Sequence, residues 1–188
     1  MIDIRGLYKS FEDKTVLSDI NASFENGKTN LIIGQSGSGK TVLMKCIVGL
    51  LTPEKGEVLY DGRNLVLMGK KEKKMLRKEM GMIFQSAALF DSMTVLDNVM
   101  FPLNMFSNDT FRDRTRRAMF CLDRVNLAEA KDKFPGEISG GMQKRVAIAR
   151  AIALNPQYLF CDEPNSGLDP KTSLVIDELV HDITHEYN

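Results

Sequence analysis

The chain has 188 residues, a length typical of one domain with at most a small inserted lobe. Its 25 basic and 25 acidic residues balance, so the composition does not draw the chain as a whole to nucleic acid or to an anionic membrane. The apolar content is 43%, but no run reaches the roughly 18 apolar residues of a membrane span, and residues 1–5 are not typical of a signal peptide. We therefore expect any membrane association to come through a partner.

The cysteines are scattered along the chain and form no CxxC pair. They are Cys46, Cys121 and Cys161. This spacing predicts buried thiols in a reducing cytosol rather than disulfides or a zinc site.

The first part of the chain is predicted to be rich in strands. Short β-rich runs and turn dipeptides occur at residues 2–7, 16–24, Asn26-Gly27, 31–33, 58–60 and Asp61-Gly62. The charged segment 70–79 predicts a helix with a solvated face, and a binding role for that face is the alternative.

The remainder alternates strands with helices. An apolar strand is expected at 81–85, a mainly helical stretch at 86–156, a second apolar strand at 158–161 and a helix at 171–187. This order predicts an α/β fold carrying a helical lobe. We expect a single domain over 1–188, with a core formed by 1–85 and 157–188 and a helical subdomain at 86–156.

Residues 34–41 read Gly-Gln-Ser-Gly-Ser-Gly-Lys-Thr, a complete glycine-rich phosphate-binding motif between an apolar run and a helical run. The glycines let backbone N–H groups face an anion, while Lys40 can reach the β- and γ-phosphates and the Thr41 hydroxyl can hold Mg²⁺. A simple Gly/Ser-rich turn is the alternative, and the flanking strand and helix patterns favour nucleotide binding. The predicted nucleotide-binding residues of this segment are Gly34, Gln35, Ser36, Gly37, Ser38, Gly39, Lys40, Thr41 and Val42.

Two carboxylates follow the apolar run 158–161. Ligands bind at the carboxyl ends of strands in open α/β sheets. Asp162 is therefore predicted to hold Mg²⁺ opposite Thr41, and Glu163 to orient or deprotonate the water that attacks the γ-phosphate. A strand followed by a polar turn is the alternative when the pair is taken alone.

A second anion site is predicted at the start of a helix. Ser139 is a good N-cap, and Gly140 and Gly141 allow close backbone approach before Met142. A simple capped helix is the alternative. One nucleotide does not need two phosphate-binding sites from one chain. The helix start at Ser139 is therefore predicted to bind the nucleotide held by another copy.

With these motifs in this order, the chain resembles the ATP-binding cassette (ABC) ATPases over essentially its whole length. The resemblance implies a P-loop NTPase (RecA-like) α/β core, an N-terminal antiparallel β subdomain and an inserted α-helical subdomain. It also implies ATP and Mg²⁺ as ligands. The working form it implies is a head-to-tail dimer, with two ATP molecules between the Walker A motif (residues 34–41) of one copy and the signature motif (Ser139 to Met142) of the other.

The resemblance assigns roles to single residues. Glu163 is the catalytic glutamate, assisted by Lys40 and by the Q-loop residue Gln85, which also contacts the metal. Asp169 belongs to the D-loop at 166–169. Phe11 occupies the place of the aromatic that stacks on adenine, with core packing as the alternative.

The signature segment, residues 138–142, points to one group of transporters within the family. It has Ile138 and Met142 where the family usually has leucine and glutamine, and with 84–90 and 93–99 it looks like the ATPases of Mla/Mce-type phospholipid transporters. This implies a permease, an MCE-type lipid-binding protein and a peripheral place on the cytoplasmic face of the inner membrane, with no nucleic-acid partner. The Phe and Met side chains of the region 86–106 predict a groove that grips a short helix of the permease, with core packing of the helical lobe as the alternative. Alternatives are an importer of a small polar solute, a soluble ABC protein acting on ribosomes or DNA, and a module that senses nucleotide without hydrolysis.

The end of the chain departs from the family pattern. The family's switch histidine follows a further strand, whereas His181 and His185 lie within a helical period that continues to Tyr187. We expect the chain to end inside this helix, so that ATP binds but turnover is slow. The two histidines also form an i, i+4 pair, but without a third ligand we expect exposed helix residues rather than a zinc site.

Overall fold

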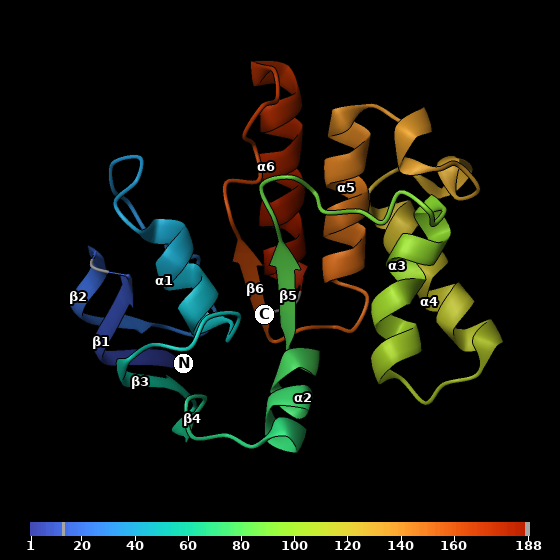
Figure 1. Ribbon diagram of the computed structural model, residues 1–188. Helices are drawn as coiled ribbons and strands as arrows, with labels where there is room; N and C mark the ends of the chain where they lie inside the picture. The colour runs from blue at the N-terminus through green and yellow to red at the C-terminus, as the bar shows by residue number, and fades with distance from the viewer. Residues whose placement is uncertain (13, 187–188) are drawn as a thin grey trace. The chain divides into compact units, whose positions relative to one another are not determined.

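The computed structural model describes residues 1–12 and 14–186, and the chain divides into two compact units inside helix α2, between Met75 and Leu76. The first unit contains β1 (Ile2–Phe11), β2 (Lys14–Phe24), α1 (Lys40–Ile47), β3 (Lys55–Tyr60), β4 (Arg63–Asn64) and the start of α2 (Lys70–Lys78). The second contains β5 (Met80–Ile83), α3 (Val95–Phe106), α4 (Phe111–Arg124), the 3₁₀ helices η1 (Ala128–Ala130) and η2 (Pro135–Glu137), α5 (Gly140–Ala151), β6 (Tyr158–Cys161) and α6 (Pro170–Glu186) (Figure 1).

The first unit is built on a four-stranded antiparallel sheet in the order β2-β1-β3-β4. The turn between β3 and β4 has positive φ at Asp61 (47°) and Gly62 (80°), the pattern that suits the twist of a two-residue hairpin. The buried Tyr60 donates a hydrogen bond of 2.8 Å from its hydroxyl to the Ile47 carbonyl, which fixes β3 to the end of α1. The predicted antiparallel β subdomain is therefore confirmed.

The expected strand at 31–33 is wrong. Residues 29–35 are assigned neither strand nor helix, and the side chains of Leu31 and Ile33 are 79% and 85% exposed. The Asn30 side chain donates to the carbonyls of Glu25 and Lys28, both at 3.1 Å, and so continues the predicted Asn26-Gly27 turn. A strand needs a neighbouring strand to pair its backbone groups, and this segment pairs with no described strand despite its β-branched sequence.

The second unit is organised around α5. Strands β5 and β6 pair in parallel, with Met80 opposite Tyr158 and Ile83 opposite Cys161. Helix α5 packs against β5 and against α3, α4 and α6, and it lies between the small sheet and the α3–α4 pair (Figure 1). Both predicted apolar strands and the helical stretch between them are confirmed. The division into a core and a subdomain at 86–156 stays a prediction.

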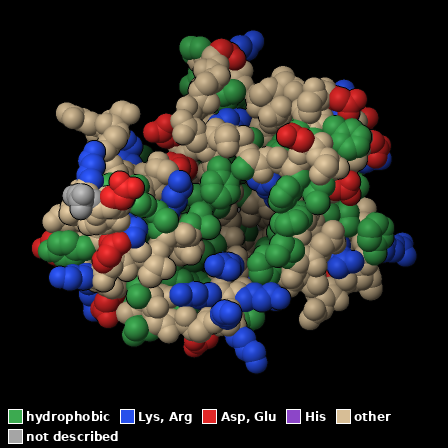
Figure 2. All heavy atoms as spheres, viewed as in Figure 1, with side chains coloured by type: hydrophobic (Ala, Val, Ile, Leu, Met, Phe, Trp, Pro, Cys, Tyr) green, Lys and Arg blue, Asp and Glu red, His purple; other side chains and the backbone are tan. Residues whose placement is uncertain are grey.

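Helix ends follow the capping rules. Thr94 caps α3 by accepting from the Asp97 N–H at 3.1 Å, and the Asp97 carboxylate accepts from the Thr94 N–H to complete a capping box. Thr110 caps α4 in the same way, accepting from the Asp113 N–H. The predicted helix in the charged segment is also confirmed as α2, in which Leu76 is buried; Figure 2 shows Lys and Arg side chains gathered over this helix.

The C-terminal helix runs unbroken to Glu186, as its sequence period predicts, while Tyr187 lies outside the described residues. His181 is exposed, with its Nδ1 3.7 Å from Oδ1 of Asp182, and no group of three metal-binding side chains gathers anywhere in the described parts of the chain. Across residues 1–12 and 14–186, no helix has both the length and the apolar character needed to cross a bilayer.

Two of the cysteine thiols, those of Cys46 and Cys121, are buried, and that of Cys161 is half-buried. Burial raises the pKa of Cys121 and of Cys161 to about 11, so both are protonated and unreactive at neutral pH. The prediction of buried thiols is confirmed for Cys46 and Cys121 and is only partly met at Cys161.

Candidate nucleotide site

The phosphate-binding motif of the first unit forms a loop that ends at the start of α1. Gly39 is the N-cap of this helix, with φ at 95°, and it has no side chain that could cap the first N–H groups. The first N–H groups of a helix have no partner within the helix, so an uncapped start is suited to bind an anion. Gly37 has φ at 78°, and a Cβ added there would meet nothing within 4 Å, which leaves the turn of the loop open on that side.

Lys40 lies within the loop rather than away from it. Its ammonium donates to the carbonyls of Gly34 at 2.9 Å and Gln35 at 3.0 Å, so two of its three donors hold the loop. A Cβ at Gly34 would lie 2.7 Å from the Ser38 hydroxyl oxygen, so a larger residue there would require this hydroxyl to move. The loop therefore fits a phosphate chain by its open helix start and its adjacent positive charge.

Phe11 lies at the end of β1 and is 44% exposed. The Lys9 ammonium is 5.2 Å from the centroid of its ring. The exposed ring is compatible with stacking on a base, and the alternative of a buried core residue is wrong. Stacking on adenine stays a prediction.

In the second unit, the ends of β5 and β6 bring together side chains that are far apart in the sequence. The Gln85 amide nitrogen donates to Oε2 of Glu163 at 3.2 Å and to the Ser166 hydroxyl at 3.0 Å. Glu163 has φ at 47°, a left-handed conformation that is uncommon outside glycine and often marks functional sites. The structure therefore brings together Gln85 and Glu163, two residues to which the resemblance assigns roles in hydrolysis.

Asp162 directly follows β6 and is 9% exposed, and its N–H donates to the Ile83 carbonyl at 2.9 Å. This bond continues the ladder between the two strands and places the carboxylate at their carboxyl ends, next to Glu163. The Asp162 carboxylate and the Gln85 amide oxygen are the oxygen ligands that Mg²⁺ prefers. Thr41 belongs to the first unit, so its sharing of one metal ion with Asp162 stays a prediction.

The signature segment starts α5 as predicted. The Ser139 hydroxyl accepts from the Met142 N–H at 3.3 Å, which makes Ser139 the N-cap. A Cβ at Gly140 would meet nothing within 4 Å, whereas one at Gly141 would lie 2.7 Å from the Thr172 methyl of α6. Gly140 therefore leaves the helix start open, and Gly141 allows α5 and α6 to approach closely. Met142 packs on the hydrophobic core.

Asp169 caps α6. Its carboxylate accepts from the N–H groups of Lys171 at 3.0 Å and Thr172 at 3.1 Å and from the Thr172 hydroxyl at 2.5 Å. These bonds, with that from the Thr172 hydroxyl the strongest, lower the pKa of Asp169 below its usual range. A nucleotide contact of Asp169 stays a prediction.

Three polar residues of this unit have structural roles that the sequence analysis did not predict. Lys144 is 6% exposed and donates to the Gln85 carbonyl, and its burial lowers its pKa. Arg150 donates to the carbonyls of Ala87 and Ala88. Asn98 is fully buried and bonds the backbone of the loop before α3. Nothing in their local sequence distinguishes them from exposed helix residues.

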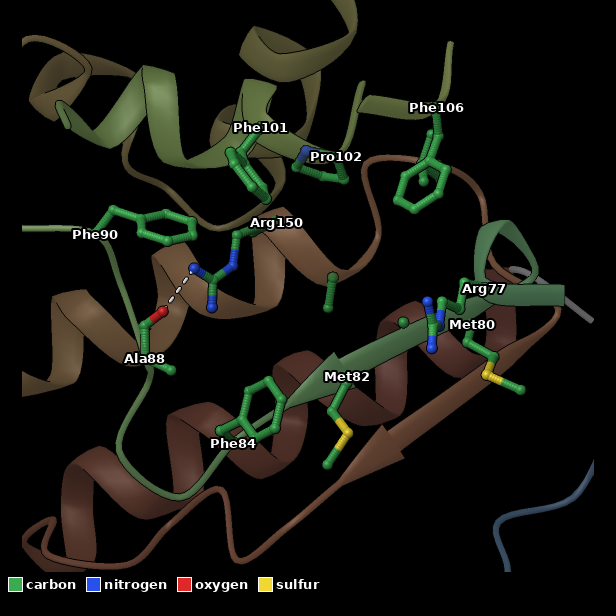
Figure 3. A pocket seen from close by; sticks show the side chains of 13 residues that line it. Arg77, Met80, Met82, Phe84, Ala88, Phe90, Phe101, Pro102, Phe106 and Arg150 are labelled. Carbon is green, nitrogen blue, oxygen red and sulfur yellow. Dashed lines mark hydrogen bonds between the residues drawn. The ribbon is translucent and has the colours of Figure 1, made fainter. Parts of the chain in front are cut away.

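A largely apolar groove of about 270 Å³ lies beside Ala88 and Arg150. Its lining includes Met82 and Phe84 from the β5 segment, Phe90 from the following loop, and Phe101 from α3 (Figure 3). The groove residues at 86–106 lie within the segment that the sequence predicts to hold a permease. The Phe90 and Phe101 rings lie next to each other, with 4.6 Å between their centroids.

Comparison with known proteins identifies the class. The structure matches a solved dimeric structure of the ATP-binding cassette MJ0796 in a post-hydrolysis state, bound to ADP and Pi, with a TM-score of 0.89, 31% identity and coverage of 99% of this chain and 84% of that chain. The model of the ABC transporter family matches residues 17–166. The fold is that of an ABC ATPase cassette, and the chain belongs to the ABC transporter family.

Relatives within the family have different printed functions. The probable ribonucleotide transport ATP-binding protein mkl of Mycobacterium leprae (strain TN) is 41% identical over 182 residues, covering 97% of this chain and 52% of that protein. The intermembrane phospholipid transport system ATP-binding protein MlaF of Haemophilus influenzae (strain ATCC 51907 / DSM 11121 / KW20 / Rd) is 38% identical over 188 residues, covering 100% of this chain and 71% of that protein. The chain thus spans about half the length of the mycobacterial relative.

Proposed function

We propose that the chain is the ATP-binding and ATP-hydrolysing part of an ABC transporter. The contact of Gln85 with Glu163, at the carboxyl ends of two parallel strands, is the observation that carries this proposal. Through this contact the Glu163 carboxylate is held by the Gln85 amide at the edge where ligands bind in open α/β sheets. The glycine loop of the first unit and the family membership support the same conclusion.

The residues divide the reaction between them. The loop from Gly34 to Val42 binds the phosphates through its N–H groups and Lys40, and Thr41, Gln85 and Asp162 hold Mg²⁺. When bound, Mg²⁺ neutralises charge on the phosphate oxygens. Glu163 orients the attacking water and accepts its proton, and the hydrogen bond from Gln85 keeps the carboxylate in place.

The working form in this proposal is a head-to-tail dimer. The open start of α5 at Ser139 and Gly140 is a second place for an anion, and one chain already has a phosphate loop. Each signature segment, with Asp169, therefore closes over the nucleotide bound by the other copy, while Phe11 stacks on the base. The matched solved structure is a dimer of an ATP-binding cassette.

The partner is an integral membrane permease, which inserts a short helix into the groove formed with the region 86–106. Aromatic and methionine side chains suit such a helix-in-groove contact. The chain then lies peripherally on the cytoplasmic face of the inner membrane. We favour phospholipid as cargo, with an MCE-type lipid-binding protein in the complex, because of the signature segment and the similarity to MlaF. A small polar solute is the second candidate, because another relative is a probable ribonucleotide transport protein.

Replacing Glu163 by glutamine tests the reaction. We expect Glu163→Gln to lower kcat by about 10²–10⁴-fold, since it removes the general base, while MgATP still binds. With MgATP this variant should accumulate as a dimer in light scattering, because hydrolysis no longer separates the copies.

Lys40→Ala is the companion variant. It should weaken MgATP binding about tenfold or more in calorimetry, because a charge-assisted contact to phosphate is lost. Wild-type protein that neither binds nor hydrolyses MgATP would contradict the proposed function.

A further inference from the structure

Helix α5 sends two cations onto the loop that follows β5. Lys144 donates its ammonium to the backbone carbonyl of Gln85. Arg150 donates from its two terminal nitrogens to the carbonyls of Ala88 and Ala87, each at 2.8 Å. Three of the four carbonyls at 85–88 are thus bound from one helix.

The environment of Lys144 is costly for a cation. Its side chain is almost completely buried, and burial of an ammonium is unfavourable unless hydrogen bonds replace its lost water. Among the described residues, the Gln85 carbonyl accepts the hydrogen bond that the ammonium donates. A methionine of similar shape would fill the same volume, so packing alone does not explain a lysine here.

Arg150 binds the two loop residues whose backbone conformation is unfavourable for alanine. Ala87 and Ala88 have φ at 60° and 48°, left-handed conformations that L-residues with a Cβ rarely adopt. Such residues persist where the surroundings fix them. The guanidinium fork joins the carbonyls of these two residues, and Figure 3 shows it reaching Ala88 from α5, beside Phe90 at the groove.

The loop held in this way carries Gln85. The backbone of Gln85 is bound by Lys144, and its side chain contacts Glu163 and Ser166. We propose that Lys144 and Arg150 are positioning residues for ATP hydrolysis: together they fix the 85–88 backbone and so keep the Gln85 amide on the Glu163 carboxylate.

This inference rests on the proposed function and adds a connection within it. The helix that carries both cations begins at Ser139, the residue predicted to close over the nucleotide of the other copy. A movement of α5 is therefore passed to Gln85 through Lys144 and to the groove loop through Arg150. Closure at the signature segment and the position of Gln85 are then linked by hydrogen bonds that lie within one unit.

A double-mutant cycle tests the role of Lys144. We expect Lys144→Met to lower kcat about tenfold with the KM for ATP changed less than about twofold, because a misplaced neighbour of the base affects the reaction more than binding. Lys144→Arg keeps a donor and should restore most of kcat. In a Gln85→Ala background, Lys144→Met should have almost no further effect, because the pathway through Gln85 is already lost.

Arg145→Met is the matched control. Arg145 lies on the same helix and donates to the Val125 carbonyl at 3.0 Å, away from the 85–88 loop. It should lower the melting temperature without the selective loss of kcat. Arg150→Lys, which keeps the charge but loses the fork, should lower kcat in the same selective way and serves if Lys144→Met does not fold.

Additive effects of Lys144→Met and Gln85→Ala, or equal loss of kcat in Arg145→Met, would overturn the positioning role. A wild-type enzyme that hydrolyses ATP and loses this activity in Glu163→Gln would leave the proposed function intact in either case.

Discussion

Gly141 shows how a single residue sets the distance between two helices. A Cβ at this position would lie 2.7 Å from the Thr172 methyl, closer than non-bonded carbon atoms approach. Thr172 cannot easily move, because its hydroxyl and its N–H both bond to Asp169 at the start of α6. The signature glycine therefore has a packing role in addition to its predicted role at the nucleotide.

We predict that Gly141→Ala lowers the free energy of unfolding by about 1–3 kcal/mol, the usual effect of overpacking a close contact. Urea unfolding measures it. Adding Thr172→Ser removes the clashing methyl while keeping the hydroxyl, so the double variant should recover most of the loss.

The neighbouring glycine provides the control for this prediction. Gly140→Ala should change stability by less than about 0.5 kcal/mol, because a Cβ there meets nothing within 4 Å. Equal destabilisation by both substitutions would show that helix propensity or capping, and not the contact with Thr172, decides the effect.

At the scale of elements, the loop before α3 is held by one buried side chain. The Asn98 amide donates to the carbonyls of Phe90 at 3.1 Å, Met93 at 3.2 Å and Thr94 at 3.0 Å, and its oxygen accepts from the Phe90 N–H at 2.8 Å. These bonds close the loop onto the helix start and fix Phe90 beside the groove. Asn98 thus links the helix cap with the surface proposed to bind the permease.

We expect Asn98→Ala to destabilise the protein by about 2–3 kcal/mol, since it leaves buried backbone groups without partners. Thermal unfolding with an independent denaturant series measures the change. Asn104→Ala, at an exposed position of the same helix, should stay within about 0.5 kcal/mol. A small effect of Asn98→Ala would mean that water replaces the amide.

At the scale of the whole molecule, the main question is which complex the cassette serves. The groove is lined mainly by apolar side chains, with Arg77 and Arg150 among them, and Phe90 lies at it with 40% of its surface exposed. Phe111 on α4 is 69% exposed and does not line the groove. The two phenylalanines therefore form a matched pair for testing a docking surface.

We predict that tagged protein isolated from native membranes carries a polytopic permease and phospholipid. Phe90→Asp should abolish this capture, because it places a charge in the apolar contact, whereas Phe111→Asp should not. Mass spectrometry of the captured protein and lipid measures both. Capture of ribosomes would contradict the phospholipid proposal. So would a captured complex whose ATPase activity responds to ribonucleotides and not to lipid.

Features that depend on neighbouring residues could be predicted from the amino-acid sequence alone. The phosphate loop needs its glycines at fixed spacing, Ser139 caps the helix that follows it, and Asp162 and Glu163 follow an apolar strand; each depends on neighbours within a few residues. The structure confirms both predicted apolar strands, and it adds their parallel pairing and the hydrogen bond from Gln85 to Glu163.

Features that depend on the packing of the folded chain could not be predicted from local sequence. The apolar run 31–33 has strand-forming residues, but it is not a strand in the structure because it pairs with none of the described strands. Lys144, Arg150 and Asn98 look like ordinary polar residues of helices in the sequence. In the fold Lys144 and Asn98 are buried, and all three bond the backbone of the loops between β5 and α3. Burial is set by the whole fold, and a buried polar group must then find a partner wherever the fold provides one.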